Sequence, residues 1–384
     1  MNRRKALSTV KLCTLEFAIY TYQRLLLPQS CRQYESEAGI KRKRDTKTKK
    51  LDSSRPNAVA LTLANPIISG KIESGENCFF SPLSLQIVLA TTVAGSNGKN
   101  RDELLSFLKF DTVDQLHSFF SKCADSVLAD GSPLDGVNLR SANAVWIDQS
   151  LSFASHFKDV LTNVYKSHAN QADFRDKKTR RGEAIKEVNA WAKEETKGLV
   201  KDFLKPKDID EYTRLIFLNA IYFKGAWERK FSPSLTKKHK FYLLDGSTVE
   251  APFMTSTERK YISAYRGFKV LRLPYRQGKD VDRNFSMYWY LPTAKDGLPG
   301  LVEKMSFDFE AIGILKDLGL VRPFVHGGFK DMVDPPGGDG LRIPSIFQKC
   351  FIEVNEKGTE AAAVTRFVAL SVRKTSYKTI KFCC

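Results

Sequence analysis

The segment 212–231, YTRLIFLNAIYFKGAWERKF, constrains the fold more than any other part of the chain. Its apolar run is too short to cross a membrane and is rich in residues that favour strands. A strand that lacks the alternation of apolar and polar residues is buried on both faces, so its sheet must be covered on both sides. Asn219 interrupts this run. A buried amide without partners costs about 1–3 kcal/mol, so other polar side chains should contact Asn219.

The remaining segments predict helices and strands without a regular β-α-β alternation, which favours the α+β class. Ser81 and Pro82 are typical of the N-cap and the first position of a helix that runs to Gly95. We expect further helices at 54–70, where Pro66 ends or kinks the helix, and at 155–165, 180–198 and 307–320. We expect strands at 141–153, 268–275 and 284–292, and a hairpin at 240–253 with an Asp-Gly turn.

The positive charge of the chain is concentrated at its two ends. Of the formal net charge of +18, residues 1–50 carry +9 and residues 361–384 carry +5, so the body between them is ordinary. The segment 41–50, KRKRDTKTKK, is typical of a disordered basic extension, and it could bind nucleic acid or another polyanion or direct nuclear import.

Sequence patterns of catalysis and metal binding are missing. The chain has no GxSxG, HExxH, GxGxxG or GxxxxGK[ST] motif, and its five histidines stand apart from one another. We therefore expect neither an enzyme nor a cofactor or metal site. The seven scattered cysteines form no CxxC pair, which favours reduced thiols in the cytoplasm. A basic start before an apolar stretch keeps the extracellular alternative open, and the basic extension keeps the nuclear one open.

The segment 353–367, EVNEKGTEAAAVTRF, contains small residues with no bulky side chain to anchor a core. Propensity alone predicts a turn of helix at TEAAAV. A period of two predicts instead a strand in which Gly358 is a flexible pivot. One face of that strand would carry Thr359, Ala361, Ala363 and Thr365, and the other would carry Glu360, Ala362, Val364 and Arg366. Such a strand could enter between two existing strands without displacing anything large.

NEKGTEAAAV resembles the hinge of the reactive loop in serpins, the serine protease inhibitors. NCFFSPLSLQIVLATTVAGSNG, SANAVWIDQSLSF, LIFLNAIYFKGAWERKF, LLDGSTVEAPFM and LPYRQGKD resemble other serpin segments, in the order of the family. LSFLKF and LADGSP are most similar to plant serpins. The resemblance implies several helices packed on a large main sheet, with smaller sheets beside it. It also implies a one-use inhibitor: a protease cleaves the loop and forms an acyl-enzyme, and the hinge then inserts into the main sheet.

The resemblance assigns a role to named positions, in a monomer whose partner is a serine protease, or alternatively a cysteine protease. The cleaved bond would lie at or beside Val372–Arg373, and Arg373 would suit a trypsin-like enzyme although it stands one position late. Trp227 falls at the top of the main sheet. The polar cluster where the sheet opens would comprise Ser81, Ser84, Asn219 and Gln348, with Gln348 in place of the usual histidine. The hinge would comprise Glu356, Gly358, Thr359, Glu360, Ala361, Ala362 and Ala363.

Besides Gln348, the sequence departs from the family at two places. Near residue 305 it lacks the segment that supplies a helix and an edge strand of the main sheet. After the cleaved bond the family continues into an anchoring strand and two buried strands, whereas this sequence ends in SVRKTSYKTIKFCC (371–384), which is polar and basic. About six lost apolar side chains at ~1.5–3 kcal/mol each would equal the stability of a typical domain, ~5–15 kcal/mol. We therefore predict a basic extension (1–50), a serpin-like domain incomplete at its C-terminal end (51–365) and an atypical tail (366–384).

Three functions follow from these departures. The first is a serpin-type inhibitor whose loop, lacking its downstream anchor, either inserts spontaneously or is cleaved as an ordinary substrate. The second is a non-inhibitory binding protein that uses the basic extension. The third is a truncated product without a function of its own.

Overall fold

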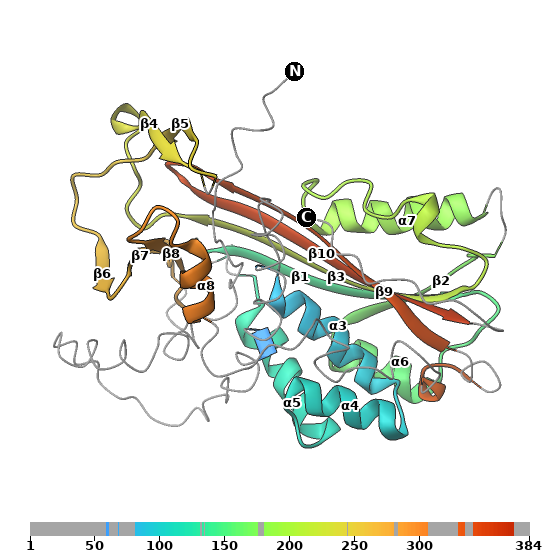
Figure 1. Cartoon of the computed structure of the whole chain (residues 1–384). Helices are drawn as coiled ribbons and strands as arrows, with labels where there is room; N and C mark the ends of the chain where they lie inside the picture. Colours follow the sequence, from blue (N-terminus) through green and yellow to red (C-terminus); the bar gives the residue numbers. More distant parts are fainter. Residues whose placement is uncertain are drawn as a thin grey trace.

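The structure is a computed structural model that describes residues 59–60, 68, 81–130, 133, 135–175, 180–243, 245–279, 283–305, 329–334 and 341–371. Its largest element is a five-stranded sheet in the order β2-β1-β3-β10-β9 (Figure 1). The strands are β1 (Asn138–Asp148), β2 (Ser167–Ala172), β3 (Thr213–Ala226), β9 (Leu341–Val354) and β10 (Gly358–Ser371). Only the β1–β2 pair is parallel among these neighbours. Among the described strands, β9 forms the outer edge beside β10.

Helices cover both faces of this sheet, as the doubly buried strand predicted. Helices α3, α4, α5 and α6 lie on one side, and α7 lies alone on the other (Figure 1). The helices are α3 (Pro82–Ala94), α4 (Gly98–Leu108), α5 (Val113–Lys122), α6 (Ser155–Asn163), α7 (Arg180–Glu195) and α8 (Leu298–Met305). The Ser81 hydroxyl accepts a hydrogen bond from the backbone N–H of Ser84 at 3.3 Å, so the predicted N-cap of α3 is confirmed.

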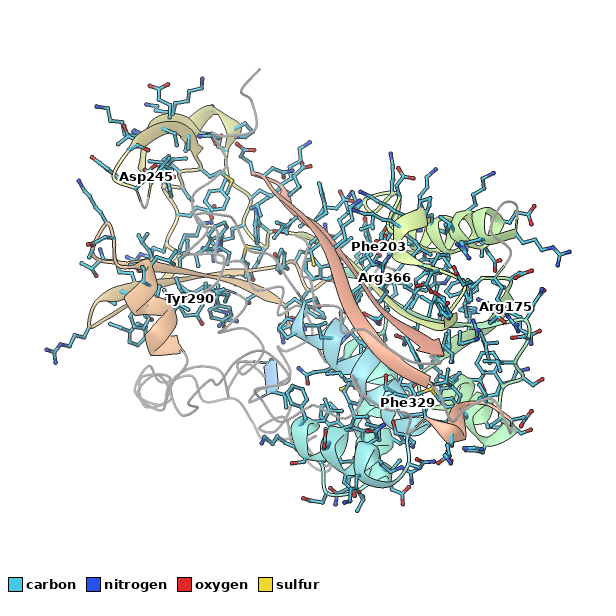
Figure 2. All side chains as sticks on the ribbon, turned by 45° about the vertical axis from the view of Figure 1, so that its right-hand side comes forward. Arg175, Phe203, Asp245, Tyr290, Phe329 and Arg366 are labelled. Atoms are coloured by element: carbon cyan, nitrogen blue, oxygen red, sulfur yellow. The ribbon has the colours of Figure 1, made fainter. Side chains whose placement is uncertain are left out.

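Two hydrophobic cores fill the two sides of the sheet. The larger core packs α3, α4, α5 and α6 against β1 and β3 and includes Phe329. The smaller core lies under α7 and includes Trp146, Phe203 and Leu218. Figure 2 places Phe203 and Phe329 on opposite sides of the sheet. Strand β3 contributes to both cores, because consecutive residues from Leu215 to Phe223 are all buried.

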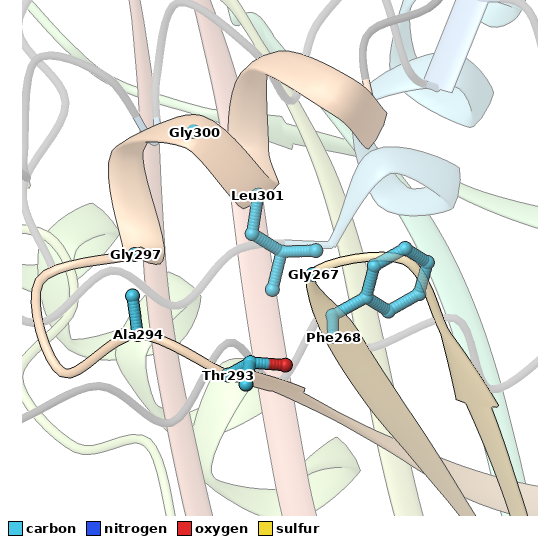
Figure 3. Close-up of a pocket in the computed structure, with 7 residues that line it drawn as sticks. All are labelled: Gly267, Phe268, Thr293, Ala294, Gly297, Gly300 and Leu301. Carbon is cyan, nitrogen blue, oxygen red and sulfur yellow. The ribbon is translucent and has the colours of Figure 1, made fainter.

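Two smaller sheets complete the predicted α+β arrangement. One is the hairpin of β4 (Lys237–Tyr242) and β5 (Thr248–Phe253), and its predicted turn is confirmed by Gly246, whose φ is 81°. The other contains β6 (Tyr261–Tyr265), β7 (Phe268–Pro274) and β8 (Ser286–Pro292). Beside α8 this sheet borders a hollow of about 390 Å³ (Figure 3). The residues that line it are glycines, an alanine, Phe268, Leu301 and Thr293. None of these lining side chains is charged, so the hollow does not indicate a catalytic or ion-binding site.

Several sequence predictions fall at the limits of the described residues. The helix expected at 307–320 and the basic segment 41–50 lie outside them. Of the helix expected at 54–70, residues 59–60 and 68 are described and are helical. The predicted gap near residue 305 is at the end of α8, and the residues after it are not described. The strand expected at 141–153 starts earlier and ends at Asp148, because a turn follows it.

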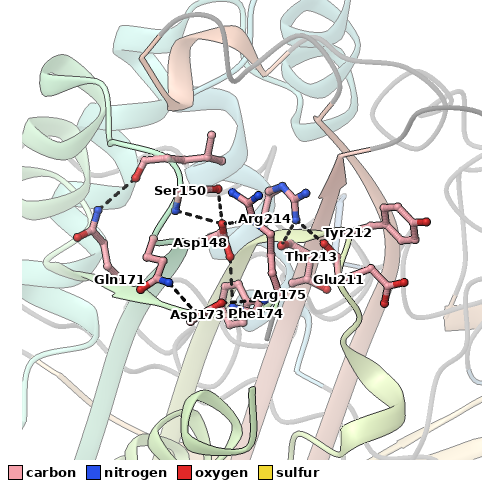
Figure 4. Close-up of polar contacts among 12 residues, drawn as sticks. Asp148, Ser150, Gln171, Asp173, Phe174, Arg175, Glu211, Tyr212, Thr213 and Arg214 are labelled. Atoms are coloured by element: carbon pink, nitrogen blue, oxygen red, sulfur yellow. Dashed lines mark hydrogen bonds and ion pairs between the residues drawn. The ribbon is translucent and has the colours of Figure 1, made fainter. Parts of the chain in front are cut away.

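A polar network closes the sheet at the end where β1 stops and β3 begins (Figure 4). The Asp148 carboxylate is fully buried. It accepts hydrogen bonds from the backbone N–H groups of Ser150 at 3.1 Å and Phe174 at 3.2 Å, and from the Arg175 side chain at 3.1 Å. These contacts tie the end of β1 to the segment that follows β2. Nearby, the Arg214 guanidinium donates to the backbone carbonyls of Glu211 and Thr213, each at 2.8 Å.

We predict that Asp148→Ala lowers the free energy of unfolding by about 1–3 kcal/mol, because it leaves the N–H of buried Phe174 without its acceptor. Arg175 is half exposed and can turn to solvent, so it adds little to this loss. Denaturant unfolding measures the change. Asp159→Ala, on the exposed face of α6, is the control and should stay within about 0.5 kcal/mol of the unaltered protein. Equal stability of the two variants would contradict the role of Asp148.

Candidate functional site at strand β10

The predicted hinge residues from Gly358 to Ala363 form the first half of β10, which lies between β3 and β9, and Glu356 lies in the turn before it. Ala363 has Ile221 of β3, which is distant in sequence, on one side, and Cys350 of β9, the strand that directly precedes β10, on the other. The segment TEAAAV is therefore a strand and not a turn of helix. The strand also continues to Ser371, beyond residue 365 where we predicted the domain to end.

The small side chains of β10 are what allow it to occupy this position. Thr359, Ala361, Ala362 and Ala363 are each at most 3% exposed. Ala362 and Val364 belong to the core under α7, whereas Thr365 contacts α3 on the opposite face. The two faces predicted from the period of two are thus the two faces observed. On the face with the charged residues, Glu360 is partly exposed, whereas Arg366 is only 1% exposed.

A buried polar cluster joins α3, β1, β3 and β10 below this strand. The Ser84 hydroxyl donates to the Asn219 side-chain oxygen and lies 2.7 Å from the hydroxyl of Thr365. The Asn219 amide donates to the Asn143 side-chain oxygen at 2.8 Å, and Asn143 donates to the carbonyl of Tyr165 at 2.7 Å. The prediction that polar side chains contact Asn219 is confirmed. Because Thr365 is part of the cluster, the hydroxyl of Ser84 bonds the inserted strand directly.

The members of this predicted cluster make different contacts. The Ser84 hydroxyl donates to Asn219, and the Ser81 hydroxyl accepts from the backbone of Ser84 as the helix cap. Gln348 is the backbone neighbour of Thr365 on β9, and only its backbone is described. Asn143 was not predicted, although an amide inside the apolar segment SANAVW is the same signal that identified Asn219.

The N-terminal end of the hinge is fixed by Trp227 at the end of β3. The Trp227 backbone N–H donates to the carbonyl of Lys357 at 3.0 Å, and its indole N–H donates to the carbonyl of Asn355 at 2.9 Å. The ring stacks on Tyr275 at 4.7 Å between centroids. Tyr275 in turn bonds the hydroxyl of Thr359 at 2.9 Å. No sequence pattern pointed to Tyr275, because its contact depends on the bridge that it forms with Trp227 in the folded chain.

Two hinge carboxylates have hydrogen-bond donors. The Thr236 hydroxyl donates to Glu356 at 2.8 Å and lowers the pKa of that carboxyl. Burial raises the pKa of Glu360, but hydrogen bonds from Tyr222 at 2.7 Å and Lys224 at 3.1 Å outweigh it, so the pKa lies below its ordinary value of 4.5. Both carboxylates are thus favoured in their charged form when the hinge is in the sheet.

Gly358 allows the backbones of β10 and β3 to approach closely. A Cβ atom at this position would lie 2.0 Å from the carbonyl oxygen of Gly225 and 2.9 Å from the Cα of Ala226. Both contacts are with backbone atoms, which cannot turn away as a side chain can. Only glycine fits here in the observed arrangement.

The predicted reactive bond, Val372–Arg373, lies outside the described residues. It follows directly after Ser371, the last residue of β10. Within the described part of the chain, no group of three or more His, Cys, Asp or Glu side chains could hold a metal ion. The helices described there include none with the length and apolarity of a membrane span.

We predict that Gly358→Ala destabilises the inserted hinge by at least about 1–3 kcal/mol, because strands β3 and β10 must separate to admit the methyl group. Hydrogen exchange of the amides at 358–363 measures the effect and should accelerate. Gly182→Ala on α7 is the matched control, since nothing lies within 4 Å of its added Cβ. Unchanged exchange in Gly358→Ala would contradict the close approach.

We predict that Glu360→Gln makes thermal stability less dependent on pH between about pH 5 and pH 3. The lowered pKa of Glu360 means that its contribution is present above pH ~4.5 and is lost as the pH falls through the lowered value. The loss at pH 7 should be at most about 1 kcal/mol, because the group is partly exposed. Glu250→Gln, exposed on β5, is the control. The same flattening in both variants would refute a specific role for Glu360.

Comparison with known proteins identifies relatives of this arrangement. The family model of the serpins, described as serine protease inhibitors, matches residues 54–312 and 298–383. Serpin-ZX of Arabidopsis thaliana is 46% identical over 342 residues, which are 81% of this chain and 86% of that protein. Serpin-ZXA of Oryza sativa is 42% identical over 325 residues, 77% of this chain and 81% of its own length.

Solved structures have the same fold. Arabidopsis AtSerpin1, in its native stressed conformation, matches with a TM-score of 0.67 and 44% identity over 74% of this chain and 79% of its own. The cleaved Serpin 42Da matches with a TM-score of 0.71 and 29% identity over 83% and 91% of the two chains. The resemblance to plant serpins found in the sequence is confirmed. With its hinge placed as a strand of the main sheet, this chain belongs to the serpin family of serine protease inhibitors.

Proposed function

We propose that this chain inhibits serine proteases as a suicide substrate. The hydroxyl of the protease attacks a carbonyl carbon at or beside Val372–Arg373, the peptide nitrogen of the next residue leaves with a proton, and an ester joins the protease to the loop. The hinge then enters the sheet as β10 before water can hydrolyse the ester. Arg373 makes a trypsin-like protease the first candidate.

The observation that carries this proposal is the fit of β10 between β3 and β9. The inserted strand has 14 residues and ends immediately before the proposed bond. At ~3.3 Å per residue, an attached protease would be carried about 45 Å, from the Trp227 end of the sheet to the opposite end. In the first half of the strand, Gly358, Thr359 and Ala361–Ala363 are small, so the hinge itself displaces no bulky group.

The sheet gains contacts by this insertion that the exposed loop does not have. Backbone hydrogen bonds form on both sides of β10, and the side chains of Thr359, Glu360 and Thr365 each acquire a polar partner. Burial of the three alanines adds an apolar contribution. These gains are the driving force that would hold a protease in place.

One observation favours a second function. In the continuous chain, β10 is already in the sheet, so the insertion that trapping requires has taken place without cleavage. A chain that rests in this state would be a non-inhibitory serpin, cleaved beyond β10 as an ordinary substrate.

The two functions predict different results on a denaturing gel after incubation with excess trypsin. We expect a band at the summed mass that survives boiling. Thr359→Arg is the control: it places a charge at a position that is 3% exposed, so insertion fails and only cleavage remains. If the unaltered chain is cleaved cleanly near Arg373 and trypsin stays active, inhibition is refuted and the second function stands.

A further inference from the structure

Arg366 is a charged residue buried in the inserted strand. It lies on the α7 face of β10, two residues after Val364 of the smaller core, and its Cα neighbour on β3 is Leu218. Its side chain is 1% exposed. Burial lowers its pKa, which a hydrogen bond from Arg366 to Asp208 partly restores. A guanidinium in this apolar layer requires a counter-charge.

Asp208 provides that counter-charge. A terminal nitrogen of Arg366 lies 3.2 Å from the Asp208 carboxylate, which is itself only 11% exposed. The guanidinium also lies over the ring of Phe203, 5.5 Å from its centroid. Figure 2 shows Phe203 and Arg366 together beside α7.

The segment that carries Phe203 and Asp208 is held in place independently of Arg366. The Asn189 side chain of α7 donates to the carbonyl of Leu204 at 2.9 Å and accepts from its N–H at 2.7 Å. The backbone N–H of Lys205 donates to the Asp208 carboxylate at 2.8 Å. The acceptor is therefore positioned by α7 before the strand arrives.

The ion pair forms only when β10 is paired in the sheet as far as residue 366. The contacts of residues 359–365 with Tyr275, Tyr222 and Ser84 do not need this ion pair. Arg366 is the first residue beyond them, and its side chain can enter the layer under α7 only if a carboxylate is there to receive it. Without Asp208, the buried Arg366 would lose this carboxylate, and solvent would be the better place for residue 366.

We propose that Asp208 is a positioning residue that decides whether β10 inserts beyond Thr365. With the carboxylate present, the strand pairs as far as Ser371. Without it, insertion stops after Thr365 and residues 366–371 stay outside the sheet. The role of Asp208 in insertion does not depend on the proposed function. Only its consequence, that full insertion is needed to hold a protease, rests on that function.

Hydrogen exchange of the full-length chain tests this, with the amides at 359–365 as the internal reference. Asp208→Asn keeps an oxygen for Lys205 but removes the charge, and we expect the amides at 366–371 to exchange at least about tenfold faster. Arg366→Met keeps an apolar stem and removes the need for the carboxylate, so protection should remain. The double variant Asp208→Asn/Arg366→Met should regain that protection.

The double variant separates this proposal from a merely structural role of Asp208. If Asp208 only held its own turn, the double variant would exchange as fast as Asp208→Asn, and the proposal would be overturned. Unchanged exchange in Asp208→Asn would overturn it as well. Asp202→Asn is the matched control: the residue is exposed on the same segment, and asparagine tolerates its φ of 49°.

The same variants show whether a failure concerns the insertion or the function. If trypsin is trapped, Asp208→Asn should raise the fraction of chain that is cleaved without trapping, and the double variant should lower it again. If no variant traps trypsin but the exchange pattern holds, the proposed inhibition falls and the role of Asp208 stands. If all variants trap trypsin equally and their amides at 366–371 exchange at the same rate, the role of Asp208 is refuted and the proposed inhibition stands.

Discussion

The pairing of β10 with both β3 and β9 is the interaction on which the rest of the site depends. It makes one continuous sheet of strands that are far apart in the sequence. It also covers the central strand β3, whose residues are buried on both faces. The pairing is tolerated because the inserted segment carries alanine, threonine and valine where larger side chains would collide with α3 or α7, and because Gly358 admits the close approach of β3.

Polar contacts then divide the inserted strand into three parts. At its start, Trp227 and Tyr275 bind the hinge backbone and Thr359. In the middle, the hydroxyl of Ser84 bonds Thr365. At residue 366, the Arg366 side chain enters the layer under α7, where Asp208 neutralises its charge. The partners of the three parts come from different segments of the chain, so several contacts support the inserted strand along its length.

Much of this could be predicted from the sequence, because local patterns report local geometry. The doubly buried strand around Asn219, the cap at Ser81, the hairpin turn and the small-residue hinge all follow from side-chain size, period and backbone preference. The position of Asn219 in an apolar run also predicted its polar neighbours. Asn143 could have been predicted by the same reasoning. Tyr275 and Asp208 could not, because no local sequence pattern predicts that they contact β10.

The sequence by itself determined that residues 358–366 can form a strand with two different faces, since a period of two and the absence of bulky side chains are local properties. Only the tertiary structure decided that this strand lies between β3 and β9 and that the charged Arg366 is buried. The helix and strand alternatives for TEAAAV differ little in local propensity, and pairing with β9 and with the distant β3 decides in favour of the strand. In the same way, a charge at Arg366 predicts exposure until the fold brings Asp208 to it, because the energy of a buried ion depends on neighbours that the local sequence does not contain.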